Sequence, residues 1–381
     1  MIIAYLYTSL TTVGGADRII TQKANYLTEK LGYEVYMITD SQEGHPFAFP
    51  LSPKIKHIDL SINFNRQYRH NACVRFFYYK FLMQLYRKKL ENLFRTIKPD
   101  IVISTLGRDM DFLTQIHDGS IKIGESHIAK QYTRNFHLIE AKGSIHKLVA
   151  GYWRKKQEEA VKQLDTLVVL TAKDAHSWNP VRETVIIPNP LTLYPTRSST
   201  CTGKQVISVG RLSEQKGYDM LINAWKKVAS VHPDWTLHIY GEGELKDKLE
   251  NSISHAQLTQ QIKLCKPTPH IMDKYLESAF YVMSSRFEGF GLVLTEAMSC
   301  GLPCISYNCP NGPSEIIKNG EDGILVENGN MDKLADAICF FMENETIRKE
   351  MGEKARKNIL RYSEKSIMQQ WDHLFQSMKK V

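Results

Sequence analysis

Short apolar segments alternate with amphipathic ones along the chain, in two successive series. The apolar segments are rich in β-branched residues, which is typical of strands buried on both faces of a parallel sheet. In the first series the predicted strands are residues 1–7, 34–39, 54–60, 100–104, 120–125, 166–171 and 184–188. In the second series they are residues 205–209, 235–240, 262–265, 280–284, 302–306 and 323–326. Because parallel strands require helical crossovers, the alternation predicts an α/β fold.

The predicted helices include residues 16–31, 76–97, 218–230, 292–299 and 364–380. The second of these ends before Pro99, because a residue that precedes proline disfavours the helical conformation. Its apolar residues recur every three or four positions and predict one buried stripe. That stripe consists of Phe76, Tyr79, Met83, Tyr86, Leu90, Leu93 and Ile97. The same helix carries further apolar residues that the stripe does not need: Phe77, Tyr78, Phe81, Leu82 and Leu85.

A segment rich in proline, serine and threonine, residues 189–200, separates the two series. Such a composition is typical of a linker. A chain of 381 residues is long for one domain and comfortable for two. The sequence therefore predicts two α/β domains, residues 1–190 and residues 204–363.

A glycine loop in the second series is followed by a short predicted helix, residues 292–299. Gly289 and Gly291 let the backbone approach a ligand closely, and the unpaired N–H groups at a helix N-terminus favour phosphate. Glu288 lies in the loop and Glu296 in the helix. Carboxylates beside an anion are unfavourable unless they accept hydrogen bonds from hydroxyls. This combination indicates a ligand that carries both phosphate and a polyol, as a nucleotide sugar does.

Seven residues separate Glu288 from Glu296, with Gly-Phe-Gly between them and Ala-Met-x-x-Gly-x-Pro directly after. The pattern resembles the E-x7-E motif of family 4 retaining glycosyltransferases of the bacterial surface-polysaccharide type, and the resemblance covers nearly the whole chain. It implies the GT-B fold, in which two doubly wound Rossmann-like domains face each other across a cleft. Residues 1–190 would bind the acceptor, residues 204–363 the nucleotide sugar, and residues 364–381 would pack back on the first domain.

The resemblance also implies a reaction. A hexose or N-acetylhexosamine moves from a nucleotide diphosphate sugar, expected to be a UDP-sugar, to a glycan hydroxyl with retention at the anomeric carbon. Glu296 would hold the ribose hydroxyls and Glu288 would contact the donor sugar. The donor loop comprises Gly289, Phe290, Gly291 and Leu292. No metal ion and no cofactor is expected.

Two basic residues lie in the loop that follows the strand at residues 205–209. Arg211 and Lys216 stand in the frame Gly-Arg-Leu-x-x-x-Lys-Gly, residues 210–217. Basic side chains are usually just solvated, but this frame matches the diphosphate clamp of the resembling family. We therefore predict that both residues stabilise the charge that develops on the leaving diphosphate.

Two features of the first domain are candidates for the same site. Gly14 and Gly15 follow the first strand, where glycines either allow a tight turn or admit a phosphate or acceptor; the residues alone do not decide between these. His127 follows the strand at residues 120–125, at a carboxyl end where open α/β sheets keep their sites. The resembling family places the glycine loop at the cleft and a histidine near the transferred sugar, so His127 is predicted to be catalytic.

Other motifs favour other functions less well. Asp109-Met110-Asp111 is a D-x-D sequence, the metal motif of a different glycosyltransferase fold, but its setting favours a helix N-terminus. Gly241-Glu-Gly-Glu lacks the third glycine of a dinucleotide fingerprint, which disfavours an NAD oxidoreductase. Residues 266–270 replace a glycine-containing turn that the family often shows near the base. The main alternative is a nucleotide-sugar 2-epimerase on the same fold.

The charge of the chain is concentrated in one segment. Residues 66–98 hold nine Lys and Arg against one Glu, a net charge of +8 that equals the net charge of the whole chain. The segment is either a core helix of the first domain whose outer face is solvated or, because aromatic residues are interleaved with the basic ones, a helix that lies on an anionic membrane. Since no nucleic-acid motif accompanies it, a lipid-linked glycan acceptor at the inner face of the cell membrane is the expected partner.

The rest of the composition adds little. The seven cysteines are an odd number without a secretory signal, which predicts free thiols. No apolar run approaches the roughly 20 residues that span a bilayer. The expected location is the cytoplasm, with peripheral attachment to the membrane. The sequence does not indicate an oligomeric state.

Overall fold

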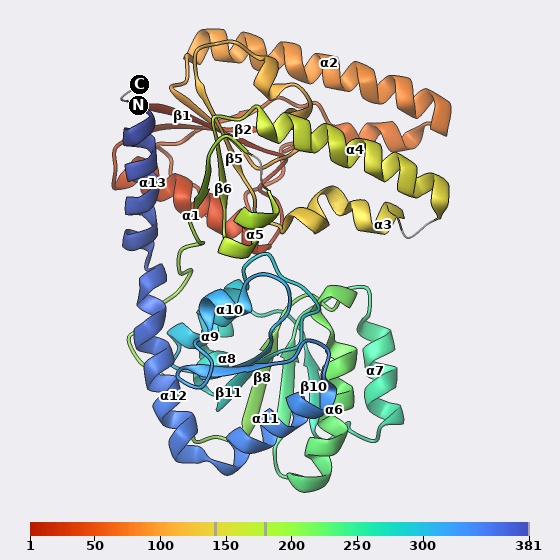
Figure 1. Ribbon diagram of the computed structural model, residues 1–381, viewed down its shortest axis with the longest axis vertical. Coiled ribbons are helices and arrows are strands. Elements are labelled where there is room, and N and C mark those ends of the chain that lie inside the picture. Colours follow the sequence, from red (N-terminus) through yellow and green to blue (C-terminus); the bar gives the residue numbers. More distant parts are fainter. Residues whose placement is uncertain (141–142, 179–180, 380–381) are drawn as a thin grey trace. The chain divides into compact units, whose positions relative to one another are not determined.

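The computed structural model describes residues 1–140, 143–178 and 181–379, which form two compact units. The first unit contains Met1–Pro188 and the helical segment from Lys365 onward, and the second contains Asn189–Glu364. Figure 1 shows a parallel sheet with helices around it in each unit. Within the described ranges, no helix is both long and apolar enough to span a bilayer.

The first unit contains seven strands: β1 (Ile2–Tyr7), β2 (Glu34–Thr39), β3 (Lys56–Asp59), β4 (Ile101–Ser104), β5 (Ile121–Glu125), β6 (Thr166–Val169) and β7 (Thr184–Ile186). Its described α-helices are α1 (Gly15–Glu29), α2 (Ala72–Ile97), α3 (Phe136–Glu140), α4 (Ser144–Lys162), α5 (Ala172–Ser177) and α13 (Glu364–Met378). Short 3-10 turns join them, among them Phe64–Arg69, Arg108–Asp111 and Lys130–Asn135.

The second unit contains six strands: β8 (Gln205–Val209), β9 (Thr236–Tyr240), β10 (Ile262–Cys265), β11 (Phe280–Met283), β12 (Cys304–Tyr307) and β13 (Gly323–Val326). Its described α-helices are α6 (Tyr218–Val231), α7 (Lys246–His255), α8 (Ile271–Leu276), α9 (Leu292–Ser299), α10 (Pro313–Ile316), α11 (Met331–Glu343) and α12 (Glu345–Asn358). The strands predicted from the sequence are thus confirmed to within a few residues.

Both sheets are parallel and doubly wound. Their strand orders are β3-β2-β1-β4-β5-β6-β7 and β10-β9-β8-β11-β12-β13. In each sheet the order reverses once, between β1 and β4 and between β8 and β11. Open α/β sheets bind ligands at such a reversal, beyond the carboxyl ends of the strands, because the loops there diverge to opposite faces.

The helix α9 begins and ends where its glycines predict. Gly291 is the N-cap with φ of 105°, in the left-handed region that favours glycine. At the other end Gly301 has φ of 82°, and the amides of Gly301 and Leu302 donate to the carbonyls of Met298 and Ala297 at 2.9 and 3.1 Å. These two bonds form a Schellman motif, which ends the helix before β12.

The helix α2 departs from the predicted stripe. Its buried residues are Leu82, Tyr86, Leu90, Phe94 and Ile97. Phe76, predicted to be in the stripe, is exposed, as are Phe77 and Phe81. The prediction was wrong for Phe76, because the N-terminal end of α2 extends past the edge of the sheet, as Figure 1 shows, and the sheet does not cover it there.

The glycines of the half fingerprint have a packing role. A Cβ on Gly241 would lie 1.9 Å from the carbonyl oxygen of Gly210, and one on Gly243 would lie 2.4 Å from that of Leu212. The two loops also exchange backbone hydrogen bonds, from Leu212 to Glu242 at 2.9 Å and from Leu245 to Leu212 at 3.0 Å. These glycines therefore allow the loop after β9 to pack directly on the loop after β8.

Candidate nucleotide-sugar site

Two loops meet where the second sheet reverses its strand order. One leads from β8 through the 3-10 turn Glu214–Lys216 to α6, and the other leads from β11 to α9. The two strands are neighbours, with Tyr281 of β11 beside Ile207 of β8. All the site residues predicted in the second domain lie on these loops or on α9.

Four consecutive backbone amides are free at the start of α9. The amides of Gly289, Phe290, Gly291 and Leu292 donate to no acceptor in the part of the chain that the structure describes. The backbone at Gly312 packs directly on this loop, since a Cβ on Gly312 would lie 2.0 Å from the carbonyl oxygen of Phe290. Free amides at a helix N-terminus provide hydrogen-bond donors and a positive dipole end for a phosphate.

The predicted cations lie on the neighbouring loop. The Nζ of Lys216 is 2.7 Å from Oε1 of Glu288, which also accepts a hydrogen bond from Ser285 Oγ at 2.6 Å. Glu288 is buried, so its carboxylate depends on these two donors. Arg211 is exposed, and its guanidinium has no partner among the described residues. It is therefore available to an incoming anion.

The two loops are fastened to each other. Arg286 forms a bidentate pair with Asp219, at 2.9 and 2.7 Å, and donates to the carbonyl of Glu214 at 2.7 Å. Ser284 Oγ donates to the carbonyl of Lys216 at 2.9 Å. Gly217 is required here, because its φ is 62° and a Cβ would lie 2.2 Å from the Ser284 carbonyl oxygen. The site is thus preorganised before a ligand arrives.

Glu296 points from α9 toward two hydroxyl groups of the protein itself. Its carboxylate accepts hydrogen bonds from Thr192 Oγ1 at 2.7 Å and from Tyr275 OH at 3.3 Å. Burial and the charge of Glu296 raise the pKa of Tyr275 well above its usual value, so this phenol stays a donor. Thr192 and Tyr275 were not predicted, since isolated hydroxyl residues far away in the sequence give no motif.

The predicted residues of the first unit lie after β1 and β5. Gly14 is the N-cap of α1, and neither Gly14 nor Gly15 has a positive φ. The preceding loop is held by Asp17, which accepts hydrogen bonds from the Thr12 amide at 2.9 Å and from Thr12 Oγ1 at 2.8 Å. His127 is largely buried, with Nε2 3.2 Å from Oε1 of Glu125.

The D-x-D sequence lies in the 3-10 turn Arg108–Asp111. Asp111 is paired with Arg134 at 3.0 Å and with Lys156 at 3.7 Å. Asp109 is buried, and its Oδ2 has no hydrogen-bond partner among the described residues. Burial raises the pKa of Asp109 to about 6, and it likewise raises that of Asp40 to about 6. The described residues contain no group of three or more His, Cys, Asp or Glu that could hold a metal ion.

The raised pKa predicts how Asp109→Asn changes stability with pH. A carboxyl whose pKa is higher in the folded state stabilises the fold below its unfolded pKa, and that contribution is lost as the pH rises through about 6. The variant does not ionise, so its free energy of unfolding should gain on that of wild type by about 1–2 kcal/mol between pH 5 and pH 7.5. Urea unfolding at both pH values measures this difference.

The matched control is Asp111→Asn, which removes a carboxylate from its ion pairs with Arg134 and Lys156. It should lower the free energy of unfolding at pH 7.5. If the free energy of unfolding of Asp109→Asn differs from that of wild type by the same amount at both pH values, the pKa of Asp109 is not raised by burial.

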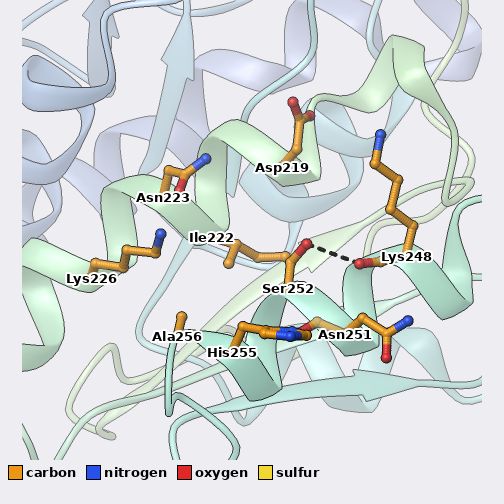
Figure 2. A pocket seen from close by; sticks show the side chains of 9 residues that line it. All are labelled: Asp219, Ile222, Asn223, Lys226, Lys248, Asn251, Ser252, His255 and Ala256. Atoms are coloured by element: carbon orange, nitrogen blue, oxygen red, sulfur yellow. Dashed lines mark hydrogen bonds between the residues drawn. The ribbon is translucent and has the colours of Figure 1, made fainter.

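A surface groove of about 610 Å³ lies elsewhere, between α6 and α7. Figure 2 shows Lys226, Lys248 and His255 along it, with Ser252 bonded to the carbonyl of Lys248 at 2.9 Å. None of the residues predicted to bind a ligand lines it. Arg211, Lys216 and the 289–292 amides have the chemistry that an anion needs, so we assign the site to them.

Comparison with known proteins gives the following relationships. Residues 199–358 match the family model described as glycosyl transferases, group 1. An uncharacterized glycosyltransferase of Haemophilus influenzae is 26% identical over 374 residues, which are 97% of this chain and 98% of that protein. The poly(ribitol-phosphate) alpha-N-acetylglucosaminyltransferase of Staphylococcus aureus is 32% identical over 235 residues, 60% of this chain and 48% of that protein.

Among solved structures, a TarM variant of S. aureus in complex with fondaparinux, alpha-GlcNAc-glycerol and UDP is similar. Its TM-score is 0.77 at 17% identity, and the match covers 98% of this chain and 99% of that chain. At this identity the likeness shows the fold. It confirms the predicted GT-B class, with two Rossmann-like units of parallel sheet.

Proposed function

We propose that this chain, whose residues 199–358 match the group 1 glycosyl transferases, is a family 4 retaining glycosyltransferase. It would move a hexose or N-acetylhexosamine from a UDP-sugar to a glycan acceptor in capsule, exopolysaccharide or lipopolysaccharide synthesis. One observation carries the proposal: four free amides, residues 289–292, lie at a strand-order reversal together with Arg211, Lys216 and two buried glutamates.

Each group has a role in the proposed reaction. The acceptor hydroxyl forms the new bond to the anomeric carbon, the bond from that carbon to the diphosphate breaks, and the hydroxyl proton leaves with the nucleotide. The 289–292 amides, Arg211 and Lys216 would stabilise the charge that collects on the diphosphate. Glu296 would hold the ribose and Glu288 the sugar. No metal ion is needed if these cations and amides supply the stabilisation.

The relatives support the substrates. The TarM structure contains UDP, and the name of the S. aureus relative specifies an N-acetylglucosaminyl group and a poly(ribitol-phosphate) acceptor. In the first unit, His127 and the Gly14-Gly15 loop would contact the transferred sugar and the acceptor, as the family resemblance implies.

The acceptor is proposed to be lipid-linked, because α2 and α4 expose apolar side chains. Phe77 on α2 is 70% exposed and Leu148 on α4 is 77% exposed. Further exposed apolar residues on these helices are Val74, Phe76, Phe81, Val149 and Tyr152. Figure 1 shows that the ends of α2 and α4 extend past the sheet in the same direction. Aromatic and basic residues on one surface are typical of a protein that lies on an anionic bilayer.

Two exposed cations of the segment, Arg75 and Lys80, lie over aromatic rings. The Nζ of Lys80 lies 4.5 Å from the centre of the Phe76 ring, and Arg75 lies over Tyr68. Other basic residues of the segment have partners within the protein: Arg87 pairs with Glu91 at 2.8 Å, and Lys89 donates to the Leu60 carbonyl at 2.6 Å. Arg75 and Lys80 are therefore the residues to reverse in a test of membrane binding.

We expect the protein to float with anionic vesicles and not with neutral ones. Each basic residue near an anionic surface contributes about 1 kcal/mol, so Arg75→Glu with Lys80→Glu should lower vesicle partitioning about 30-fold or more. The control Lys226→Glu with Lys248→Glu carries the same charge change on the groove of Figure 2 and should float as wild type does. Equal recovery with neutral vesicles, or equal losses in both variants, would contradict membrane docking.

The proposed activity itself is tested by a donor screen. Labelled nucleotide sugars are incubated with the protein, with and without lipid-linked glycan acceptors, and released nucleotide and labelled product are measured. A transferase releases UDP and labels the acceptor, and EDTA leaves the rate unchanged. Conversion of the sugar without acceptor would instead indicate the 2-epimerase, and activity lost in EDTA and restored by manganese would contradict metal independence.

A further inference from the structure

A buried polar cluster lies between β1, α1 and β5 of the first unit. Lys23 of α1 forms an ion pair with Oε1 of Glu125, and Tyr5 of β1 donates a hydrogen bond to Oε2 of the same carboxylate. The Lys23 Nζ also lies 3.3 Å from Tyr5 OH. Lys23 and Glu125 are each 1% exposed. The cluster has no access to solvent.

Filling a core with such a cluster is energetically unfavourable compared with filling it with apolar side chains. Taking two charges out of water costs several kcal/mol each, and apolar residues of similar volume often stabilise a protein as well or better. Burial holds the pKa of Lys23 well below its usual value. The ring of Trp371 on α13 covers the ammonium group at 3.7 Å, a cation–π contact that offsets part of this cost. A cluster retained at this cost is a candidate for a functional role.

His127 is a neighbour of the cluster. Its Nε2 is 3.2 Å from Glu125 Oε1, the oxygen that also pairs with Lys23, and it has no hydrogen bond of good geometry among the described residues. Other charges that follow β5 bond to one another: Lys130 pairs with Glu158 at 2.9 Å, and its amide donates to Asp174. Among the described residues, Glu125 is the carboxylate that lies within 4.0 Å of the imidazole.

We propose that Glu125 is a positioning residue for His127, and that Lys23 and Tyr5 hold Glu125 as the carboxylate that orients this ring and sets its protonation. Because one ring nitrogen faces Glu125, the other is left for a ligand. Lys23 supplies the counter-charge to Glu125. The catalytic relevance of this positioning rests on the proposed function, in which His127 lies near the transferred sugar.

Opposite substitutions should have opposite effects. In Glu125→Gln the ring loses its carboxylate and keeps the Lys23 cation nearby, so the NMR titration midpoint of His127 should fall by about 1 pH unit or more. In Lys23→Met the Glu125 carboxylate loses its cation, and a protonated His127 ring becomes more favourable beside it. The titration midpoint of His127 should therefore rise by a similar amount. The double variant, neutral at both positions, should titrate between the two single variants.

The measurement uses the full chain with isotope-labelled histidine, and His127→Asn identifies the resonance. Tyr5→Phe is the milder variant if a single charge change prevents folding, and it should raise the midpoint by a smaller amount. A midpoint that moves by less than about 0.3 pH unit in the single variants and in Tyr5→Phe would overturn the proposal. Because no sugar donor is needed, this result is independent of whether the chain transfers sugar.

Once a donor is known, a kinetic measurement tests whether the cluster affects turnover. Glu125→Gln and Lys23→Met should lower kcat while the Kd for UDP stays within about twofold of wild type, because the nucleotide is bound in the second unit. Unchanged kcat in both variants would show that the cluster does not act on the reaction.

Discussion

Replacing Lys216 by alanine is expected to lower the turnover number for sugar transfer about 10²–10³-fold, and Arg211→Ala should do the same. The analogy is the deletion of one donor from an oxyanion hole, which removes about 2.7–4 kcal/mol of transition-state stabilisation. Lys216 lies beside Glu288 at 2.7 Å on a loop that Arg286 and Ser284 hold in place. A preorganised cation of this kind would stabilise the leaving diphosphate without rearranging.

Steady-state kinetics with the donor identified by the screen provides the measurement. Lys226→Ala is the matched control, since Lys226 is an exposed lysine of the same unit that lines the groove between α6 and α7. Its turnover should equal that of wild type. If Lys216→Ala and Arg211→Ala both keep turnover within threefold of wild type, these residues are not the diphosphate clamp.

Glu296→Ala should weaken the binding of UDP about 10- to 100-fold, because hydrogen bonds to a charged group contribute about 1.5–3 kcal/mol. Glu288→Ala should leave the Kd for UDP within about threefold of wild type and lower kcat at least about 100-fold, since its proposed partner is the transferred sugar. Calorimetric titration with UDP separates the two roles, because UDP has the ribose and lacks the sugar.

Both glutamates also have hydrogen-bond partners within the protein. The experiment must therefore distinguish a lost ligand contact from a disturbed local structure. Without Glu296 the hydroxyls of Thr192 and Tyr275 lose an acceptor, so part of any loss of binding could come from a disturbed α9. Thr192→Val removes one of these hydroxyls and keeps the carboxylate, and it should bind UDP within about threefold of wild type. A Glu296→Ala variant that binds UDP as tightly as wild type would contradict the ribose assignment.

The parts of the fold that the sequence predicts well have local signals. β11, α9 and β12 follow from an apolar run, two glycines with positive φ at the ends of a helix, and a second apolar run. The site follows from the same stretch, since a helix N-terminus after a strand lies at the carboxyl edge of a parallel sheet by geometry. No long-range contact is needed for either prediction.

The cluster around Glu125 has no such signal. Tyr5, Lys23 and Glu125 belong to three elements, and the Lys23–Glu125 pair spans 102 positions in the sequence. A lysine in an amphipathic helix is normally interpreted as a surface residue, whereas here Lys23 faces Tyr5 and Glu125 and is covered by Trp371 of α13. The error in α2 has a related cause, because a periodic pattern shows which face is apolar and not how far the sheet extends beneath it.

The most direct test of the donor site is a crystal structure of the full chain with UDP bound. We expect the diphosphate to lie against the amides of residues 289–292, with Arg211 and Lys216 within hydrogen-bonding distance of its oxygens and Glu296 bonded to the ribose hydroxyls. Diphosphate bound elsewhere, such as at the groove lined by Lys226 and Lys248, with the 289–292 amides left free, would contradict it.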